Sequence, residues 1–226
     1  TGTSSCLTTQ SFEILGYDPL TISETHTNVS CNGAMDGSIV VSVSGGTGDY
    51  TYVWQDMMPT DEDYEYLGPG VYSVVVTDEN DCSVSIEVEI TEPEELTILE
   101  THTNVSCNLG NDALIDLTVS GGVAPYNYFW SNGETIEDIS NLGVGFYSVL
   151  VTDSNDCTET LELEITEPEE LIISETHTNV SCNGAMDGSI VVSVSGGTGD
   201  YTYVWQDMMP TDEDYEYLGP GIYSVV

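Results

Sequence analysis

The sequence contains no lysine and no arginine, although it carries 40 Asp and Glu residues and a formal net charge of −40. Without cations to neutralise phosphate groups, the chain is excluded as a nucleic-acid-binding protein. An anionic membrane surface would repel it for the same reason. Such a charge also opposes compaction, so we expect bound cations or a salty medium to support the fold.

Several other features are absent. The six cysteines include no Cys-x-x-Cys pair of the kind that binds metals. They recur at fixed spacings instead, which predicts disulfides and an oxidising, extracellular compartment. The sequence shows no signal peptide, no apolar run of transmembrane length and no initiator methionine. We therefore expect it to be an internal segment of a longer protein.

The chain is a repeat. The segment THTNVSCN occurs at Thr25–Asn32, Thr101–Asn108 and Thr176–Asn183, and Ser23–Gly70 is identical to Ser174–Gly221. This periodicity predicts tandem modules of about 75 residues, joined by short proline-containing junctions that favour extended, semi-rigid geometry. We name them by residue range: a tail of a preceding module (1–19), repeat 1 (20–95), repeat 2 (96–170) and an incomplete repeat 3 (171–226).

Within each repeat, apolar residues alternate with polar ones. Ile39, Val41 and Val43 share one face of a predicted strand, and the predicted last strand alternates in the same way from Val84 to Ile90. This period of two is typical of half-buried strands, and no segment shows a helical pattern. The alternation, with an apolar share of 39%, also argues against disorder as the interpretation of an acidic chain. We predict an all-β fold of immunoglobulin-like β-sandwich modules arranged end to end, with six or seven strands each.

Two kinds of aromatic residue support this fold class, because an immunoglobulin-like sandwich buries a Trp on its third strand and anchors a Tyr at a corner. The predicted core tryptophans are Trp54, Trp130 and Trp205. The predicted corner tyrosines are Tyr72, Tyr147 and Tyr223.

The combined pattern resembles the SprB-type repeat of giant adhesins from gliding Bacteroidota. It comprises Val-Ser-Cys-Asn-Gly-x-x-Asp-Gly-Ser-Ile, Val-Ser-Gly-Gly-Thr, an aromatic strand ending in Trp, Gly-x-Tyr-Ser-Val and Thr-Asp-x-Asn-Asp-Cys. The resemblance covers essentially the whole chain. It implies a bacterial cell-surface adhesin that is exported by the type IX system and moved during gliding motility.

For the cysteines, we predict disulfides within repeats, Cys31–Cys82 and Cys107–Cys157, with Cys6 and Cys182 paired outside the sequence. Such a bond would stabilise a module by about 4 kcal/mol on the chain-entropy model. The alternative is a set of bonds across junctions, Cys6–Cys31 and Cys82–Cys107, and this alternative stays open.

Calcium is the candidate ligand. If Cys31 bonds Cys82, Asp36 comes close to a second group of oxygen donors, which calcium prefers. The predicted sets are Asp36 with Asp78, Asn80 and Asp81, and Asp112 with Asp153, Asn155 and Asp156. The same residues are also favoured in turns, so we prefer diffuse cation binding by the acidic surface over a calcium cage.

An acidic loop, 56–66, is the candidate contact surface, because exposed loops often carry function. Its candidate residues are Asp56, Met57, Met58, Asp61, Glu62 and Asp63. The three histidines, one in each repeat, are too sparse for a zinc site and lack partners for a catalytic triad.

We therefore expect no enzyme but a structural stalk in which the modules act as spacers, with neighbouring modules of the same chain as partners. The alternative is a calcium-dependent module that binds a glycan or a solid surface through its acidic loops. We expect neither nucleic-acid binding nor membrane insertion.

Overall fold

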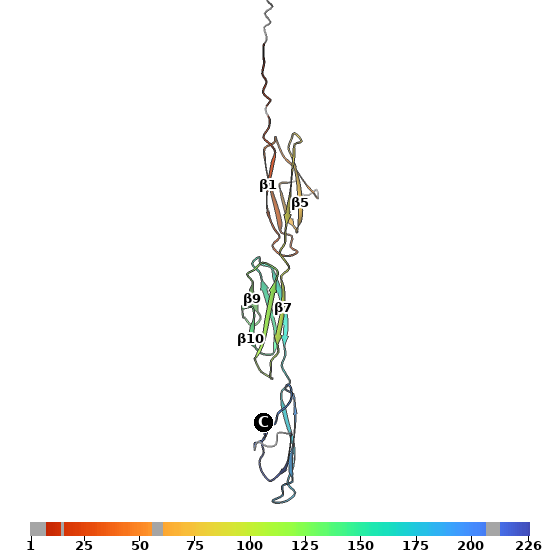
Figure 1. The fold of residues 1–226 in the computed structure, drawn as a ribbon, viewed down its shortest axis with the longest axis vertical. Helices are drawn as coiled ribbons and strands as arrows, with labels where there is room; N and C mark the ends of the chain where they lie inside the picture. The colour runs from red at the N-terminus through yellow and green to blue at the C-terminus, as the bar shows by residue number, and fades with distance from the viewer. Residues whose placement is uncertain (1–7, 15, 56–60, 207–212) are drawn as a thin grey trace, which may run out of the picture. The chain divides into compact units, whose positions relative to one another are not determined.

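The computed structural model describes residues 8–14, 16–55, 61–206 and 213–226, and this part of the chain consists of antiparallel β-strands and loops (Figure 1). None of these residues forms a helix long and apolar enough to span a membrane. The strands of repeat 1 are β1 (Thr21–Thr27), β2 (Gly37–Ser44), β3 (Thr51–Trp54), β4 (Asp63–Leu67), β5 (Gly70–Thr77) and β6 (Ser83–Ile90). Those of repeat 2 are β7 (Thr97–Thr103), β8 (Ala113–Ser120), β9 (Asn127–Trp130), β10 (Ile139–Leu142), β11 (Gly145–Thr152) and β12 (Thr158–Ile165). Those of repeat 3 are β13 (Ile172–Thr178), β14 (Gly188–Ser195) and β15 (Asp214–Leu218).

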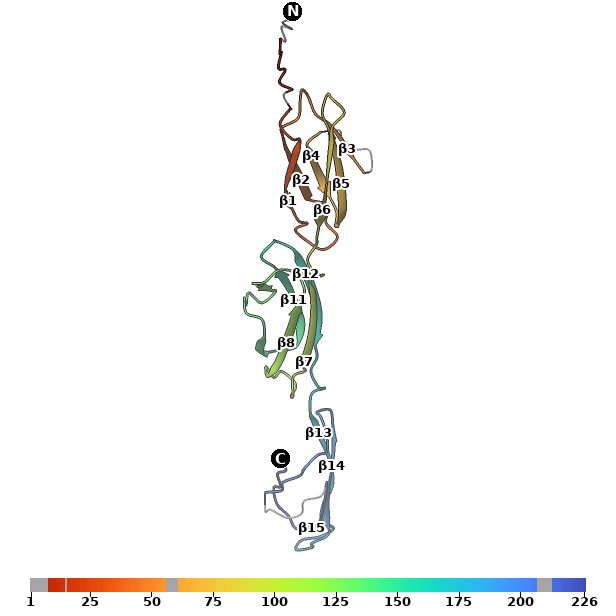
Figure 2. The same cartoon turned by 45° about the horizontal axis from the view of Figure 1, so that its top comes forward.

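Each of the first two repeats forms a pair of three-stranded sheets. In repeat 1 the strand orders are β1-β2-β4 and β3-β5-β6 (Figure 2). Repeat 2 has the same orders as β7-β8-β10 and β9-β11-β12. These orders correspond to strands A-B-E and C-F-G of an immunoglobulin sandwich. The predicted all-β, immunoglobulin-like fold class is therefore confirmed.

The cores follow the predicted alternation. Along β2, Ile39 and Val41 are buried whereas Val40 is 42% exposed. Along β6, Val88 and Ile90 are buried, whereas Glu87 and Glu89, which alternate with them, are exposed. The buried positions of repeat 1 form one cluster and those of repeat 2 form another. Burying apolar side chains in this way stabilises each sandwich.

The aromatic anchors lie where the sequence places them. All three tryptophans are at most 2% exposed. The indole Nε1 of Trp54 donates to the Asp61 carbonyl at 3.0 Å, so its polar atom is also satisfied. The corner tyrosines donate to carbonyls four residues upstream, Tyr72 to Gly68 at 3.0 Å and Tyr147 to Gly143 at 3.1 Å. Tyr223 makes the same bond in repeat 3.

Contacts divide the chain into two compact units. Unit 1 comprises Thr1–Leu96 with Gly121–Ala124 and Ser154–Cys157, two loops that come from repeat 2. Unit 2 comprises the rest of repeat 2 and all of repeat 3. The contact units thus differ from the sequence repeats, whose boundaries stay a prediction.

Repeat 3 has an open core among its described residues. An open pocket of about 540 Å³ is lined by Ile190, Trp205, Leu218 and Tyr223, among others. In the first two repeats the last strand, β6 or β12, pairs along the whole length of its neighbour and buries its final isoleucine. In repeat 3 the only described pairing in this region is a bridge between Trp205 and Val225.

Candidate functional site

The loop that joins β1 to β2 has a fixed conformation. The backbone N–H of Ser30 donates to Asp36 at 3.0 Å, and the Ser30 hydroxyl also donates to this carboxylate. The N–H of Gly33 donates to the Glu92 carboxylate at 2.6 Å, which ties the loop to the segment after β6. The bonds from the Ser30 hydroxyl and N–H hold the pKa of Asp36 below its usual value. These contacts position Cys31 at the surface of unit 1.

The hairpin between β11 and β12 carries the second cysteine. Its tight turn places Asp156 at φ 63°, a conformation that Asp adopts more readily than most residues. The N–H and the hydroxyl of Ser154 both donate to the Val123 carbonyl at 2.8 Å, which fixes the start of the turn. Cys157 follows directly.

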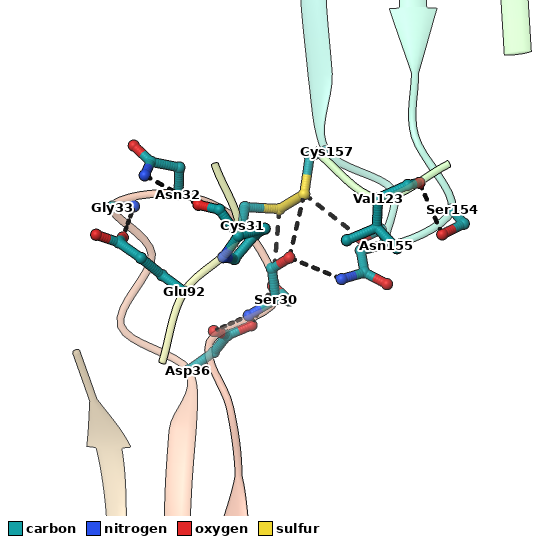
Figure 3. Close-up of a disulfide and its surroundings, with 11 residues drawn as sticks. Ser30, Cys31, Asn32, Gly33, Asp36, Glu92, Val123, Ser154, Asn155 and Cys157 are labelled. Atoms are coloured by element: carbon teal, nitrogen blue, oxygen red, sulfur yellow. Dashed lines mark hydrogen bonds between the residues drawn. A yellow bond between two sulfur atoms is a disulfide. The ribbon is translucent and has the colours of Figure 1, made fainter. Parts of the chain in front are cut away.

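The loop and the hairpin are covalently joined within unit 1. Cys31 and Cys157 form a disulfide with a Cα–Cα distance of 5.7 Å and a sequence separation of 126 residues. Beside it, the side-chain amide of Asn155 donates to the Ser30 carbonyl at 2.9 Å (Figure 3). The bond therefore connects the first loop of repeat 1 to the last hairpin of repeat 2.

The predicted pairings Cys31–Cys82 and Cys107–Cys157 are wrong. The Cys31 loop lies at the end of β6, since the N–H of Val29 donates to the Thr91 carbonyl at 3.0 Å. Cys82 lies just before the start of the same strand, which has 8 residues. At about 3.3 Å per residue the two cysteines are roughly 25 Å apart, whereas a disulfide requires Cα atoms within about 7 Å.

The alternative pairings across a junction, Cys6–Cys31 and Cys82–Cys107, are also wrong. Cys31 is bonded to Cys157 and not to Cys6, which lies outside the described residues. Cys82 and Cys107 are exposed free thiols, as is Cys182. A bond between repeats does exist, but it joins residues that neither prediction paired.

The predicted calcium sets do not assemble. Asp36 lies in the Cys31 loop, and Asp78 lies at the other end of the sandwich, beside Cys82. Burial opposes ionisation of Asp78, but bonds from Cys82, Asn80 and Thr47 outweigh it and hold its pKa below the usual value. These bonds serve the turn, and the side chain is 6% exposed.

Repeat 2 shows the same separation. Asp112 accepts from the Ser106 N–H at 3.0 Å in the Cys107 loop, while the buried Asp153 begins the opposite hairpin with Asn155 and Asp156. Across the described ranges, no group of three or more His, Cys, Asp or Glu side chains is placed to hold a metal ion. Diffuse cation binding by the acidic surface stays a prediction.

The candidate contact loop is only partly described, since Asp56, Met57 and Met58 lie outside the described residues. The other three residues, Asp61, Glu62 and Asp63, are exposed. The Glu62 carbonyl accepts from the Val41 N–H at 3.1 Å, which holds this part of the loop against β2. Its role in contacts remains a prediction.

The histidines form one repeated contact. His26 Nδ1 lies 3.0 Å from Glu24 Oε2, and the other two histidines pair with the equivalent glutamates in the same way. Each pair lies on the first strand of its repeat, with the histidine and glutamate two residues apart on one face. The arrangement is a local pair on the strand surface.

The sequence did not indicate the structural roles of three asparagines, one of which, Asn155, was predicted as a calcium ligand instead. Asn28 accepts from the Thr91 N–H at 2.9 Å, and Asn104 accepts from the Thr166 N–H at 2.8 Å, so each fixes the start of a junction. Asn155 supports the disulfide through Ser30. The recurrence of Asn-Val-Ser-Cys before the second strand of each repeat was the available signal for Asn28 and Asn104.

Comparison with solved structures finds arrays of immunoglobulin domains. The eight N-terminal Ig domains of Down Syndrome Cell Adhesion Molecule (DSCAM) match at 11% identity over 85% of this chain, with a TM-score of 0.40. The chain spans only 36% of that structure. An amphioxus IgVJ-C2 molecule matches at 13% identity, with 66% of this chain and 97% of that one covered and a TM-score of 0.28.

A third similar structure contains the four N-terminal Ig domains of Dscam1, at 10% identity and a TM-score of 0.24, with 89% of this chain and 65% of that one covered. Curated protein sequences show no match to the chain. The model of the SprB repeat family matches residues 23–58, 99–135 and 174–209. SprB repeats with a disulfide and a sandwich fold fit an adhesin-like, extracellular repeat segment. The chain is thus similar to the SprB repeat at three places, one in each repeat.

Proposed function

We propose that the chain is a spacer segment of an extracellular adhesin, in which successive repeats are joined covalently to hold other parts of the protein away from the cell. The Cys31–Cys157 bond carries this proposal. A bond between consecutive repeats constrains their separation and supplies no chemistry to a ligand. Such a constraint is useful to a structural element, and the proposal assigns no catalytic step to the chain.

The sequence identity of repeats supports the same proposal. Ser23–Gly70 and Ser174–Gly221 do not differ at any position. A spacer needs only length and can use the same sequence in each repeat, whereas a set of binding modules gains from repeats whose surfaces differ. Placement of the spacer in a gliding adhesin exported by the type IX system rests on the SprB-type resemblance alone.

A height measurement tests the spacer role directly. The chain is attached to a flat surface through its N-terminus, and the height of a fluorophore at its C-terminus is measured for one copy and for two copies joined in tandem. A spacer predicts that the height roughly doubles at 0.15 M salt, where surface charges interact only over about 8 Å. An unchanged height would contradict the proposal.

A binding measurement tests the rival function. The whole chain is applied to a glycan array and to mineral and plastic surfaces, with calcium and with a chelator. The spacer role predicts no saturable binding in either condition. Saturable binding that the chelator abolishes would support the calcium-dependent adhesive module instead.

A further inference from the structure

We propose that the Cys31–Cys157 bond is one instance of a general rule, in which the loop cysteine of each repeat bonds the hairpin cysteine of the next repeat. The two cysteines of any one repeat then bond two different neighbours. Cys107 and Cys182 lie in the loop between the first two strands of their repeats, and under this rule each would bond a hairpin cysteine of the following repeat. Cys82 lies in the last hairpin of repeat 1 and would bond a loop cysteine of the preceding repeat. The proposal concerns covalent connectivity and does not depend on the spacer function.

The loops that carry the free cysteines Cys107 and Cys182 already have a contact seen in the Cys31 loop. Ser106 and Ser181 donate their N–H groups at 3.0 Å to Asp112 and Asp187, as Ser30 does to Asp36. In repeat 2 the loop is also tied to the following junction, since the Leu109 N–H donates to Glu167 at 2.6 Å. Both free loop cysteines thus follow a serine that is held by the same aspartate contact as Ser30, and Cys107 also shares the junction contact of the Cys31 loop.

The hairpin half is also preformed. Asp81 precedes Cys82 at φ 62°, and Asp156 precedes Cys157 at φ 63°. The N–H of Glu79 donates to the Thr47 carbonyl at 3.1 Å, as that of Ser154 does to the Val123 carbonyl at 2.8 Å. The backbone around the free hairpin cysteine therefore matches the backbone around the bonded one.

An open pocket beside Cys107 leaves space for the hairpin that would carry its partner cysteine. Within unit 2, Ser106, Cys107 and Asn108 border an open pocket of about 770 Å³ that is also lined by Tyr201 and Val226 of repeat 3. In unit 1 the equivalent loop is in contact with the hairpin around Cys157 (Figure 3). The pocket lies where a hairpin of this type, supplied by a completed repeat 3, would reach Cys107.

Formation of the bond is an ordinary thiol oxidation. Two thiols each lose a proton, one S–S bond forms, and two electrons pass to an oxidant such as glutathione disulfide, which is reduced to two glutathione thiols. Where an oxidant of this class is present, the proposed pairing requires no other reactant.

The test completes repeat 3 with residues of repeat 1. A copy of Val76–Pro93 is appended after Val226, because Val71–Val75 of repeat 1 align with the last five residues of the chain. The extended chain also carries Cys82→Ser and Thr25→Ser, because the native and copied Cys82 peptides, and the Cys31 and Cys182 peptides, would otherwise be identical. It is oxidised in a glutathione buffer, digested with a protease that cuts at Asp and Glu, since trypsin has no site, and mapped by mass spectrometry without reduction. We expect the copied Cys82 to be bonded to Cys107 in at least nine of ten molecules.

Internal controls are available in the same sample. The Cys31–Cys157 bond reports that oxidation and folding have taken place, and Cys107→Ser is expected to remove the new bond while leaving that one intact. A bond between the copied Cys82 and Cys182, which lies in the same repeat, would overturn the rule. A copied Cys82 that stays reduced while Cys31–Cys157 forms would overturn it as well.

A second measurement keeps the proposal testable if the extended chain fails to fold. The original chain is mixed with a synthetic peptide of sequence Val76–Pro93 in the same buffer. Cys107 and Cys182 have the same local loop, but only Cys107 borders the pocket in unit 2. We expect at least a tenfold preference for the mixed disulfide at Cys107, and equal labelling of both cysteines would contradict the rule.

Discussion

At the scale of single residues, the aspartates of the cysteine loops are structural. Asp112 accepts bonds from the hydroxyl and the N–H of Ser106, and these bonds hold its pKa below the usual value of 3.8. Asp36 and Asp187 have lowered pKa values for the same reason. A carboxylate whose charged form is favoured by folding stabilises the folded state only while it is ionised.

This property predicts a pH-dependent effect of Asp112→Asn. The folded-state pKa is lowered, so the stabilisation is present above pH 3.8 and is lost as the pH falls through the folded-state pKa. We expect the variant to unfold at a lower temperature than the wild type at pH 7, and the two midpoints to converge below pH 3.8. Circular dichroism during heating, from pH 7 to pH 2, measures both midpoints.

Asp116→Asn is the matched control for this experiment, because it removes the same charge at an exposed position on β8. Its midpoint is expected to stay within a small offset of the wild type at every pH. An equal loss of stability in both variants would show that net charge, and not the Ser106 contacts, causes the effect.

At the scale of elements, a bulge marks the same strand in every repeat. Where β2 pairs with β4, the register shifts between Gly37 and Ser38 and leaves Tyr66 without a partner. Tyr66 has φ 61° and is 77% exposed. In repeat 2 the equivalent residue is Asn141, at φ 58°. Left-handed backbone costs an ordinary side chain about 1–2 kcal/mol, and asparagine tolerates it better.

We therefore expect Tyr66→Asn to stabilise repeat 1 by about 0.5–1 kcal/mol. The reciprocal change, Asn141→Tyr, is expected to destabilise repeat 2 by a similar amount. Hydrogen exchange of the β2 and β4 amides, and of the β8 and β10 amides, measures each repeat separately. Stabilisation or destabilisation by both substitutions would contradict the assignment of strain to the tyrosine.

The strands and anchors could be predicted because their signals are local. Ile39 and Val41 alternate with polar neighbours, and Trp54 lies in an aromatic strand, so each position indicates its own burial. Tyr72 follows a Gly-Pro-Gly turn that leaves a carbonyl within reach of its hydroxyl. No knowledge of the direction of other strands was needed.

The disulfide could not be predicted because it depends on the direction of every strand before it. If every strand ran opposite to the strand before it, the loop after β1 and the loop before β6 would lie at the same end of the sandwich. Both β1 and β4 are antiparallel to β2, and both β3 and β6 are antiparallel to β5. The Val29–Thr91 bond places the end of β6 beside the loop after β1, so β1 and β6 run in the same direction, and therefore β3 and β4 do as well. This single missing reversal moves Cys82 to the end opposite Cys31.

At the scale of the whole molecule, the charge of −40 is compatible with folding because burial and cross-linking oppose repulsion. The carboxylates lie mainly on strand faces and loops that remain in water, where salt screens them. A bond that closes a loop of 126 residues stabilises the folded chain by about 5 kcal/mol on the chain-entropy model. This term is comparable to the whole stability of a small domain.

The same bond decides how the chain responds to pulling. Tension applied at the two termini passes from Cys31 directly to Cys157, so the residues between them carry none while the bond is intact. A stretched polypeptide spans about 3.6 Å per residue, and the 126-residue separation therefore conceals about 450 Å of contour length. Single-molecule pulling is expected to give a fully unfolded length that is greater by this amount after reduction, and equal lengths would contradict the connectivity.

The bond thus acts as a mechanical bypass. Repeats 1 and 2 can be under external tension without most of their strands being pulled apart, and the force needed to lengthen the segment is set by a covalent link in place of hydrogen bonds. A reducing environment would turn the same segment into an extensible one.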